Sequence, residues 1–299
     1  MIEIKNVTKN FDDFTALKEA DIFIEKGTVY GLVGPNGSGK TTLIKCLCGV
    51  YRTNAGTITV DGEPVYDNPS LKERIAYIPD DLYFPATYTP RDMAKFYSTM
   101  YPSFSWEKYE KLGKLFQLDE KKRIARFSKG MQKQVIFWVC MSCCPDVIVL
   151  DEPVDGLDPV MRKKVWSVIL QEVEERQVTV LISSHNLREL EDVCDHVGIL
   201  HQGEVLLQKA LSDMKSDTFK LQVAFNGDFP QVLSEKLSVL NHTQTGRVHL
   251  LIIRGSREDI LQQVEAYEPV LADLIPLTLE EVFIYELGGK GYDFKNILD

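Results

Sequence analysis

The sequence predicts an α/β fold with a buried, largely parallel sheet, a helical subdomain and a small α+β unit at the C-terminal end. Two short, continuous apolar runs, residues 147–150 and 178–182, are typical of strands buried on both faces. Residues 28–33 form a third such strand, which runs into a Gly-rich loop and then into a helical segment at 41–50. Residues 91–124 are rich in Lys, Glu, Leu, Phe and Tyr without strand alternation, which predicts several helices.

The N-terminal region is predicted to add an antiparallel β subdomain. Residues 2–4 and 21–25 alternate between apolar and polar side chains, as half-buried strands do. Residues 57–60 form another strand, which enters a tight turn at Asp61-Gly62. A further short strand is expected at residues 74–79.

The middle of the chain is predicted to form a helical subdomain over about residues 86–145. Tyr101-Pro102-Ser103 separates two of its helices, and Ser105 is a candidate N-cap for the second. A helix is expected at 131–144, and another, after the apolar strand at 147–150, at 161–176.

We predict a domain boundary near residue 211, which gives a first domain of residues 1–211 and an accessory α+β domain of residues 212–299. Residues 219–223 and 248–253 are expected strands in the second domain. Ser256 begins a predicted helix with carboxylates in its first turn. This domain carries no motif that indicates a ligand.

Composition excludes some classes of function. The net charge of -10 over 299 residues argues against a general nucleic-acid binder, which needs a surplus of Lys and Arg. No run approaches the ~20 apolar residues of a membrane-spanning helix, and the N-terminus alternates like a strand, so we expect a cytosolic chain unless a partner holds it at a membrane.

Cys140 and Cys143 form a lone C-x-x-C, for which we favour buried, reduced thiols over a metal site.

A phosphate-binding loop is the clearest motif. Gly34, Gly39, Lys40 and Thr41 fit G-x-x-x-x-G-K-[ST], after a strand and before a helix. Glycines let backbone N–H groups turn toward phosphate oxygens, and the helix N-terminus adds its dipole. Lys40 is expected to reach the β- and γ-phosphates, and the Thr41 hydroxyl to ligate Mg²⁺.

Two carboxylates follow the apolar strand at 147–150. Asp151, at the strand's end, is suited to holding Mg²⁺, usually through water. Glu152 points to another side of the chain and can polarise an attacking water. The alternative, a solvated pair of acids, is disfavoured by the apolar run before them and by Pro153 after them.

These motifs, with others in register, resemble the nucleotide-binding subunit of an ABC (ATP-binding cassette) transporter over about residues 1–209. Residues 34–42 match the Walker A loop and residues 147–152 match Walker B. Phe11 matches the aromatic residue that stacks on adenine, and His185, after Ser183-Ser184, matches the switch histidine. The candidate ATP-binding residues are therefore Phe11, Gly34, Pro35, Asn36, Gly37, Ser38, Gly39, Lys40, Thr41 and Thr42.

The resemblance extends to residues that act on a partner. Phe127 to Gln132 match the signature motif, and Gly156-Leu157-Asp158 match the D-loop. In this family two P-loop cassettes dimerise head to tail, and each ATP lies between one Walker A loop and the partner's signature. The residues expected to act in trans are Ser128, Lys129, Gly130, Met131 and Gln132.

The resemblance implies ATP hydrolysis with Mg²⁺, with Glu152, His185 and Lys40 as catalytic residues. It also implies a second cassette, identical or different, and a separate membrane permease that holds the chain at the inner face of the membrane. The helical subdomain would face that permease. The transported substrate and the direction of transport stay open.

Two positions depart from the family pattern. Asp80 stands where a Gln usually follows the strand at 75–79, and we expect it to remain a metal ligand beside Thr41 and Asp151 while it changes the hydrolysis rate. The alternative is a regulatory cassette that hydrolyses ATP slowly. In the signature, Lys129 replaces a Gly and Met131 replaces a Gln, and this Ser-Lys-Gly-Met form resembles that of exporter-type cassettes acting on antibiotics, lipids or ions.

Other ATP-dependent classes fit less well. A translation-associated ABC protein carries two tandem cassettes, and a chromosome or repair ATPase carries a long coiled coil between Walker A and the signature. A small-molecule kinase lacks the signature. We find one cassette, no long coiled coil between residues 51 and 126, and a signature motif, so none of these three classes fits.

Overall fold

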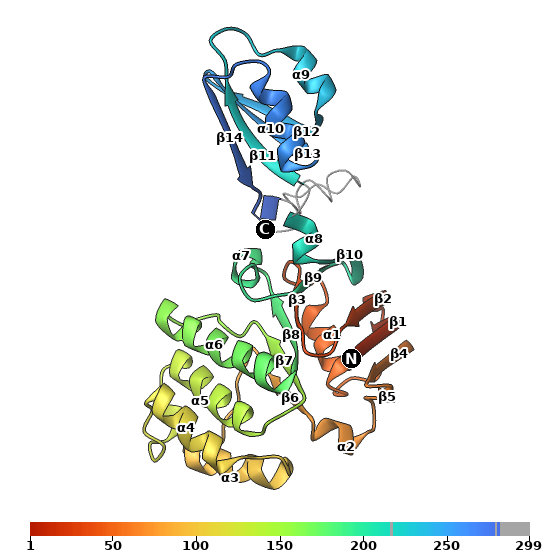
Figure 1. Ribbon diagram of the computed structural model, residues 1–299. Coiled ribbons are helices and arrows are strands. Elements are labelled where there is room, and N and C mark those ends of the chain that lie inside the picture. Colours follow the sequence, from red (N-terminus) through yellow and green to blue (C-terminus); the bar gives the residue numbers. More distant parts are fainter. Residues whose placement is uncertain (216–217, 279, 282–299) are drawn as a thin grey trace. The chain divides into compact units, whose positions relative to one another are not determined.

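The computed structural model describes residues 1–215, 218–278 and 280–281, and the chain divides into two compact units. The first unit comprises Met1–Gln208 and the second begins at Lys209 (Figure 1). Residues 282–299 of the predicted accessory domain lie outside the described residues.

An antiparallel sheet forms one layer of the first unit. It contains β1 (Ile2–Phe11), β2 (Phe14–Ile24), β4 (Ala55–Val60) and β5 (Glu63–Pro64), in the order β2-β1-β4-β5. The first two strands are longer than the sequence pattern predicts. Asn6 and Glu19 adopt positive φ angles of 49° and 46°, and the β1–β2 register shifts beside Asn6. Because such a bulge breaks the alternation of side chains, only the ends of these strands show a strand pattern.

A second sheet holds the apolar strands that the sequence predicts. Its order is β10-β9-β3-β8-β7-β6, and neighbours from β9 to β6 are parallel. The strands are β3 (Val29–Val33), β6 (Ile75–Ile78), β7 (Val147–Asp151), β8 (Thr179–Ser184), β9 (His196–His201) and β10 (Glu204–Ala210). Every residue of β3, β7 and β8 is buried, which explains their continuous apolar character.

Helix α1 (Lys40–Leu47) packs between the two sheets. Its Leu43, Ile44 and Leu47 are fully buried in one core cluster with Ile4 of the antiparallel sheet and Val149 of the parallel sheet. The start of α1 is thereby fixed relative to the ends of the parallel strands. Three other helices complete this part of the unit: α2 (Pro69–Lys72), α6 (Pro159–Arg176) and α7 (Leu187–Leu190).

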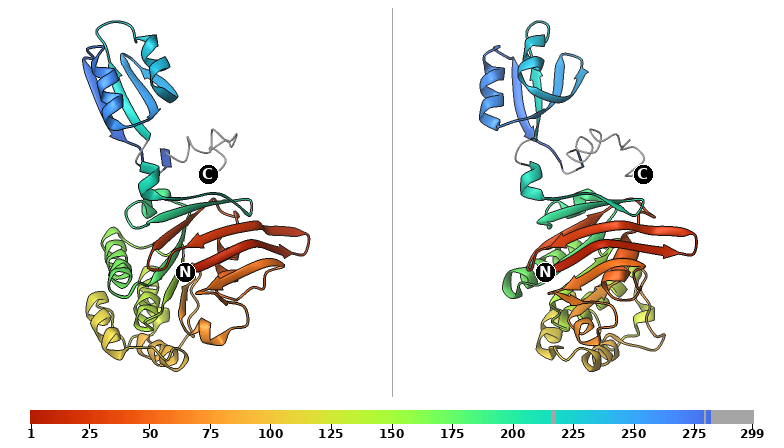
Figure 2. Two further views of the ribbon diagram at one scale, coloured as in Figure 1. Left: turned by 45° about the vertical axis from the view of Figure 1, so that its right-hand side comes forward. Right: turned by 90° about the vertical axis from the view of Figure 1, so that its right-hand side faces the viewer.

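The predicted helices between residues 90 and 142 gather in one group (Figures 1 and 2). They are α3 (Pro90–Met100), α4 (Trp106–Phe116), the short 3-10 helix η1 (Ile124–Arg126) and α5 (Lys129–Ser142). Ser105 caps α4 as predicted, because its side chain accepts a hydrogen bond from the backbone N–H of Lys108. The Tyr109 and Trp138 rings stack at 4.4 Å between centroids and join α4 to α5.

The second unit has a β-α-β-β-α-β order after a short first helix, α8 (Leu211–Lys215). Its elements are β11 (Thr218–Ala224), α9 (Gln231–Lys236), β12 (Ser238–Thr245), β13 (Val248–Arg254), α10 (Arg257–Glu265) and β14 (Leu271–Pro276). The antiparallel order β12-β13-β11-β14 is that of a ferredoxin-like module. Ser256 caps α10, as the sequence predicts.

The cysteines are free thiols, and Cys140 and Cys143 are buried in α5 and at its end. Burial raises the pKa of Cys140 to about 12, so this thiol stays protonated at neutral pH. Among the helices of the described residues, none is long and apolar enough to cross a membrane.

Candidate functional site

The strand order brings the predicted motifs together at one edge of the parallel sheet. Strand β8 lies between β3, which leads into the phosphate loop, and β7, which leads into Asp151 and Glu152. Ser184 pairs with Val33 on one side, and Ser183 pairs with Asp151 on the other. The carboxyl ends of parallel strands are where ligands bind in such sheets.

The loop after β3 adopts backbone angles and close approaches that require glycine. Gly37 and Gly39 have φ angles of 80° and 110°, which side chains of L-residues disfavour. At Gly34 a Cβ atom would collide with the carbonyl oxygen of Leu200 and lie 2.6 Å from Ser38 Oγ. Ser38 Oγ is buried and has no hydrogen-bond partner within the described part of the chain. A polar hydroxyl held in this way fits a site for an anionic oxygen.

Lys40, the first residue of α1, folds back over this loop. Its Nζ atom donates hydrogen bonds to the carbonyl oxygens of Gly34 at 2.6 Å and Pro35 at 3.2 Å. The Lys40 side chain is 6% exposed, and its Nζ lies 3.5 Å from Oε1 of Glu152. The predicted phosphate-binding ammonium and the predicted base therefore lie together.

The carboxylate of Glu152 lies between Lys40 and His185. Its Oε2 atom is 3.0 Å from Nδ1 of His185 and accepts a hydrogen bond from the His185 backbone N–H at 3.3 Å. The Glu152 side chain is 12% exposed. Charge–charge and hydrogen-bond contacts thus orient this carboxylate from the start of α1 and from the end of β8.

Asp151 is held separately from Glu152. Its carboxylate is buried, and Oδ1 accepts a hydrogen bond of 2.6 Å from the hydroxyl of Ser183. The same hydroxyl accepts a hydrogen bond from the backbone N–H of Glu152 at 3.1 Å. Sequence reasoning missed this bridging role of Ser183, because only the pairing of β7 with β8 reveals it.

A cavity of about 320 Å³ lies beside the phosphate loop. It is lined by Phe14, Ala16, Asn36, Gly37, Gly39, Lys40, Thr41, Thr42, Asp80 and Glu152. Phe11, the predicted adenine contact, is not in this lining. Its ring packs edge-to-face on Tyr51 with 5.3 Å between centroids, whereas the exposed Phe14 of the same hairpin, which we did not predict, lines the cavity.

Asp80 reaches a different partner from the one that the sequence suggests. Its Oδ1 atom lies 3.2 Å from Nζ of Lys133 on α5, a residue that we did not single out. The same Nζ donates a hydrogen bond of 2.9 Å to the backbone carbonyl of Glu152. Lys133 stands two residues before the apolar run from Val135 to Met141 of the same helix, and this position beside a buried segment is the signal that could have identified it.

The signature and D-loop residues cap helices. Ser128 caps α5 by accepting from the Met131 N–H, and Asp158 caps α6 by accepting from the Val160 N–H. A Cβ at Gly130 would lie 3.0 Å from the carbonyl oxygen of Gly156. A second cavity of about 340 Å³, distinct from the one at the phosphate loop, is lined by Asp80, Asp81, Leu82, Lys129, Gln132, Lys133, Asp155 and Gly156.

One three-residue group among the described residues has metal-ligand spacing. Ligand atoms of Glu152, Asp155 and His185 lie within 4.8 Å of one another. Asp155 was not among the predicted site residues. The predicted hydroxyl ligand, Thr41, lines the 320 Å³ cavity together with Glu152 and Asp80.

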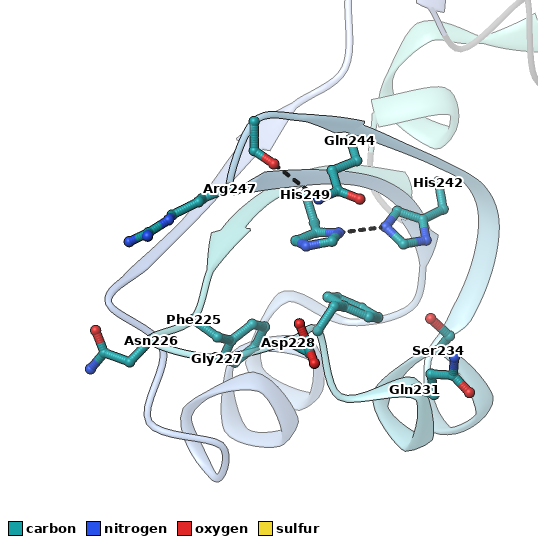
Figure 3. A pocket seen from close by; sticks show the side chains of 12 residues that line it. Phe225, Asn226, Gly227, Asp228, Gln231, Ser234, His242, Gln244, Arg247 and His249 are labelled. Carbon is teal, nitrogen blue, oxygen red and sulfur yellow. Dashed lines mark hydrogen bonds between the residues drawn. The ribbon is translucent and has the colours of Figure 1, made fainter.

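The second unit has a cavity of its own, of about 810 Å³, between the β11–α9 loop and the β12–β13 hairpin (Figure 3). His242 Nε2 and His249 Nδ1 lie 3.0 Å apart there, and the Phe229 ring packs against both imidazoles. Burial, together with His242, lowers the pKa of His249 below its usual value. None of the predicted site residues lies in this cavity.

Comparisons with known proteins agree with this arrangement. Residues 17–155 match the family model described as ABC transporter. The chain is 32% identical to the ABC transporter ATP-binding protein YtrB of Bacillus subtilis, over 97% of this chain and 99% of that protein. It is also 32% identical to the bacitracin transport ATP-binding protein BcrA of Bacillus licheniformis, over 72% of this chain and 71% of that protein.

Solved structures of ABC transporter cassettes have the same fold as the first unit. The ATP-binding subunit of an ABC transporter superposes with a TM-score of 0.67 at 26% identity, over 72% of this chain and 92% of that chain. A bacterial ABC transporter cassette solved as a dimer gives 0.64 at 22% identity, over 71% of this chain and 99% of that chain. The predicted P-loop fold with antiparallel and helical subdomains is therefore confirmed. The chain belongs to the family of ABC transporter ATP-binding proteins, ATPases that are coupled to transport.

Proposed function

We propose that ATP binds at the Gly34–Thr42 loop of this subunit and that Glu152 is the general base of its hydrolysis. The observation that carries this proposal is the position of the Glu152 carboxylate, 3.5 Å from Lys40 Nζ and 3.0 Å from His185 Nδ1 on the wall of the cavity. A carboxylate at that place can accept a proton from a water molecule that attacks the terminal phosphate. Lys40, His185 and the loop N–H groups then stabilise the charge that develops on phosphate oxygens.

Lys40 changes partners in this proposal. Its Nζ donates to the carbonyl oxygens of Gly34 and Pro35. A bound phosphate oxygen would compete with these two carbonyl oxygens for the hydrogen atoms of the ammonium group. A charge-assisted bond to phosphate is stronger than one to a neutral carbonyl. On the aromatic hairpin, Phe11 remains our candidate for stacking on adenine, and Phe14 is the second aromatic residue available to it.

The donor set fits Mg²⁺. Magnesium prefers oxygen ligands: the Thr41 hydroxyl, on the cavity wall, would bind the ion directly, and the buried Asp151 carboxylate would hold it through water. Ser183 fixes the orientation of Asp151 by donating to its Oδ1. When bound, the ion would neutralise phosphate charge.

We further propose that the site is completed by a second cassette, either another copy or a related chain. The residues offered to that partner's ATP are Ser128, Lys129, Gly130, Met131, Gln132 and Asp158. The pair would act on a separate permease at the inner face of the membrane. Similarity to the bacitracin protein BcrA and to the linearmycin resistance protein LnrL of Bacillus subtilis, 29% identical over 72% of this chain, supports membership of the exporter-type subgroup.

A slow, regulatory cassette is the less favoured alternative, because the base, its histidine and the phosphate lysine converge. The ATPase rate of the unchanged chain separates these two functions, and Glu152→Gln tests the role of the base. The variant keeps the size of the side chain and removes the carboxylate, so we expect turnover to fall by about 10²- to 10⁴-fold. ATP should then hold two copies together on gel filtration. If the variant stays monomeric with ATP and hydrolyses it normally, both the role of Glu152 as base and the ATP-dependent pairing of two cassettes are refuted.

A further inference from the structure

Lys133 makes two contacts that no other described lysine makes. Its side chain is 10% exposed, and Nζ lies 3.2 Å from Asp80 Oδ1 and 2.9 Å from the carbonyl oxygen of Glu152. The Lys therefore joins three segments: α5, the loop after β6 and the residue after β7. These segments carry the signature, the position of the missing Gln and the candidate base.

The backbone of Glu152 needs such a contact. Its φ angle is +47°, in the left-handed region that residues other than Gly rarely adopt. Conformations of this kind persist only where the surroundings hold them. Here the N–H of Glu152 donates to Ser183 Oγ, and its carbonyl accepts from Lys133. In this backbone conformation the carboxylate of Glu152 faces Lys40 and His185.

Charge explains why an acid stands at position 80. A mostly buried ammonium is costly unless an opposite charge or several acceptors compensate it. A Gln at this position could accept a hydrogen bond from Lys133 but could not neutralise it. Asp80 supplies the charge, and because its side chain is 54% exposed, its own desolvation is small.

We propose that Lys133 is a positioning residue that holds Glu152 in its catalytic conformation, and that Asp80 is the counter-ion of Lys133 and not a ligand of Mg²⁺. The proposal rests on Glu152 being the base. It accounts for the departure at position 80 as one half of a charge pair whose other half lies in α5, the helix that carries most of the signature.

The test compares Lys133→Met, Lys133→Arg, Asp80→Asn and the double variant Lys133→Met/Asp80→Asn in the full-length chain. Phosphate release is measured over ranges of ATP and Mg²⁺. Lys133→Met should lower kcat by about 10- to 100-fold with little change in KM for ATP, because a misplaced base slows chemistry and not binding. Lys133→Arg keeps the charge and should recover most of kcat.

Asp80→Asn is the more discriminating variant, because the exposed side chain can change without risk to folding. It should lower kcat by up to about fivefold in the otherwise unchanged chain and have no effect once Lys133 is Met. The Mg²⁺ concentration for half-maximal rate should not change. Lys108→Met is the matched control: it removes another mostly buried Lys, paired with Glu172 at 2.5 Å, and should lower thermal stability without lowering kcat.

Two results would overturn the proposal. One is an Asp80→Asn variant that needs about tenfold more Mg²⁺ in both backgrounds, which would make Asp80 a metal ligand. The other is normal kcat for Lys133→Met. If Glu152→Gln is inactive while Lys133→Met is normal, only the positioning role fails; if Glu152→Gln also turns over normally, the assignment of the base fails first.

Discussion

The Nδ1 atom of His185 lies 3.0 Å from Oε2 of Glu152, and the backbone N–H of His185 lies 3.3 Å from the same oxygen. The two residues follow the adjacent parallel strands β8 and β7. A residue predicted to sense the terminal phosphate therefore also orients the candidate base. A small displacement of the end of β8 would move the carboxylate.

His185→Ala should lower kcat about 100-fold, because it removes a group that orients Glu152 and that we propose to contact phosphate oxygens. ATP affinity should change little, since Lys40 and the loop N–H groups remain. The readouts are phosphate release and nucleotide binding, with His242→Ala in the second unit as the control. An unchanged kcat in His185→Ala would contradict the assigned role.

Gly34→Ala should abolish ATP binding. The added Cβ collides with the Leu200 carbonyl and crowds Ser38 Oγ, so the loop must shift away from its phosphate-binding shape. Gly62→Ala is the control, because its φ angle is +83° but a Cβ there meets nothing within 4 Å. The control should lose stability by about 1 kcal/mol and bind ATP normally. Normal binding by Gly34→Ala would show that this glycine is not required.

Asp92→Asn should destabilise α3 in a pH-dependent way. Asp92 closes a capping box with Thr89, and hydrogen bonds from the Thr89 side chain and backbone hold the pKa of Asp92 below its usual value. The stabilisation is therefore present above the unfolded pKa of about 3.9 and is lost as the pH falls through the folded pKa. Urea unfolding should show a loss of up to about 1 kcal/mol at pH 7 that narrows below about pH 4. A pH-independent difference would contradict this.

Much of the fold could be predicted from local patterns. The buried strands β3, β7 and β8 are continuous apolar runs, and Ser105 and Ser256 cap helices where the sequence places them. The full length of β1 could not be predicted, because the bulge at Asn6 reverses the alternation. The edge strand β12 was not predicted, because its side chains are mostly exposed and polar and show no alternation of apolar and polar residues.

The site was predictable in its parts but not in its contacts. Lys40, Glu152 and His185 follow from motif spacing, and the structure brings them together. Lys133 lies 53 residues from Asp80, and only the packing of α5 against β6 shows that they pair. Phe11 and Phe14 are both phenylalanines of the same hairpin, and only the hairpin geometry shows that Phe14 lines the cavity.

The central claim is a composite ATP site that needs residues from two cassettes, and mixing two inactive variants tests it most directly. Glu152→Gln lacks the base but keeps the signature, whereas Ser128→Arg blocks the signature but keeps the base. If the residues act in trans, each mixed dimer contains one intact site, so an equal mixture of the full-length variants should recover about a quarter of the wild-type ATPase rate. If the mixture stays as inactive as its components, the composite site of two copies is contradicted.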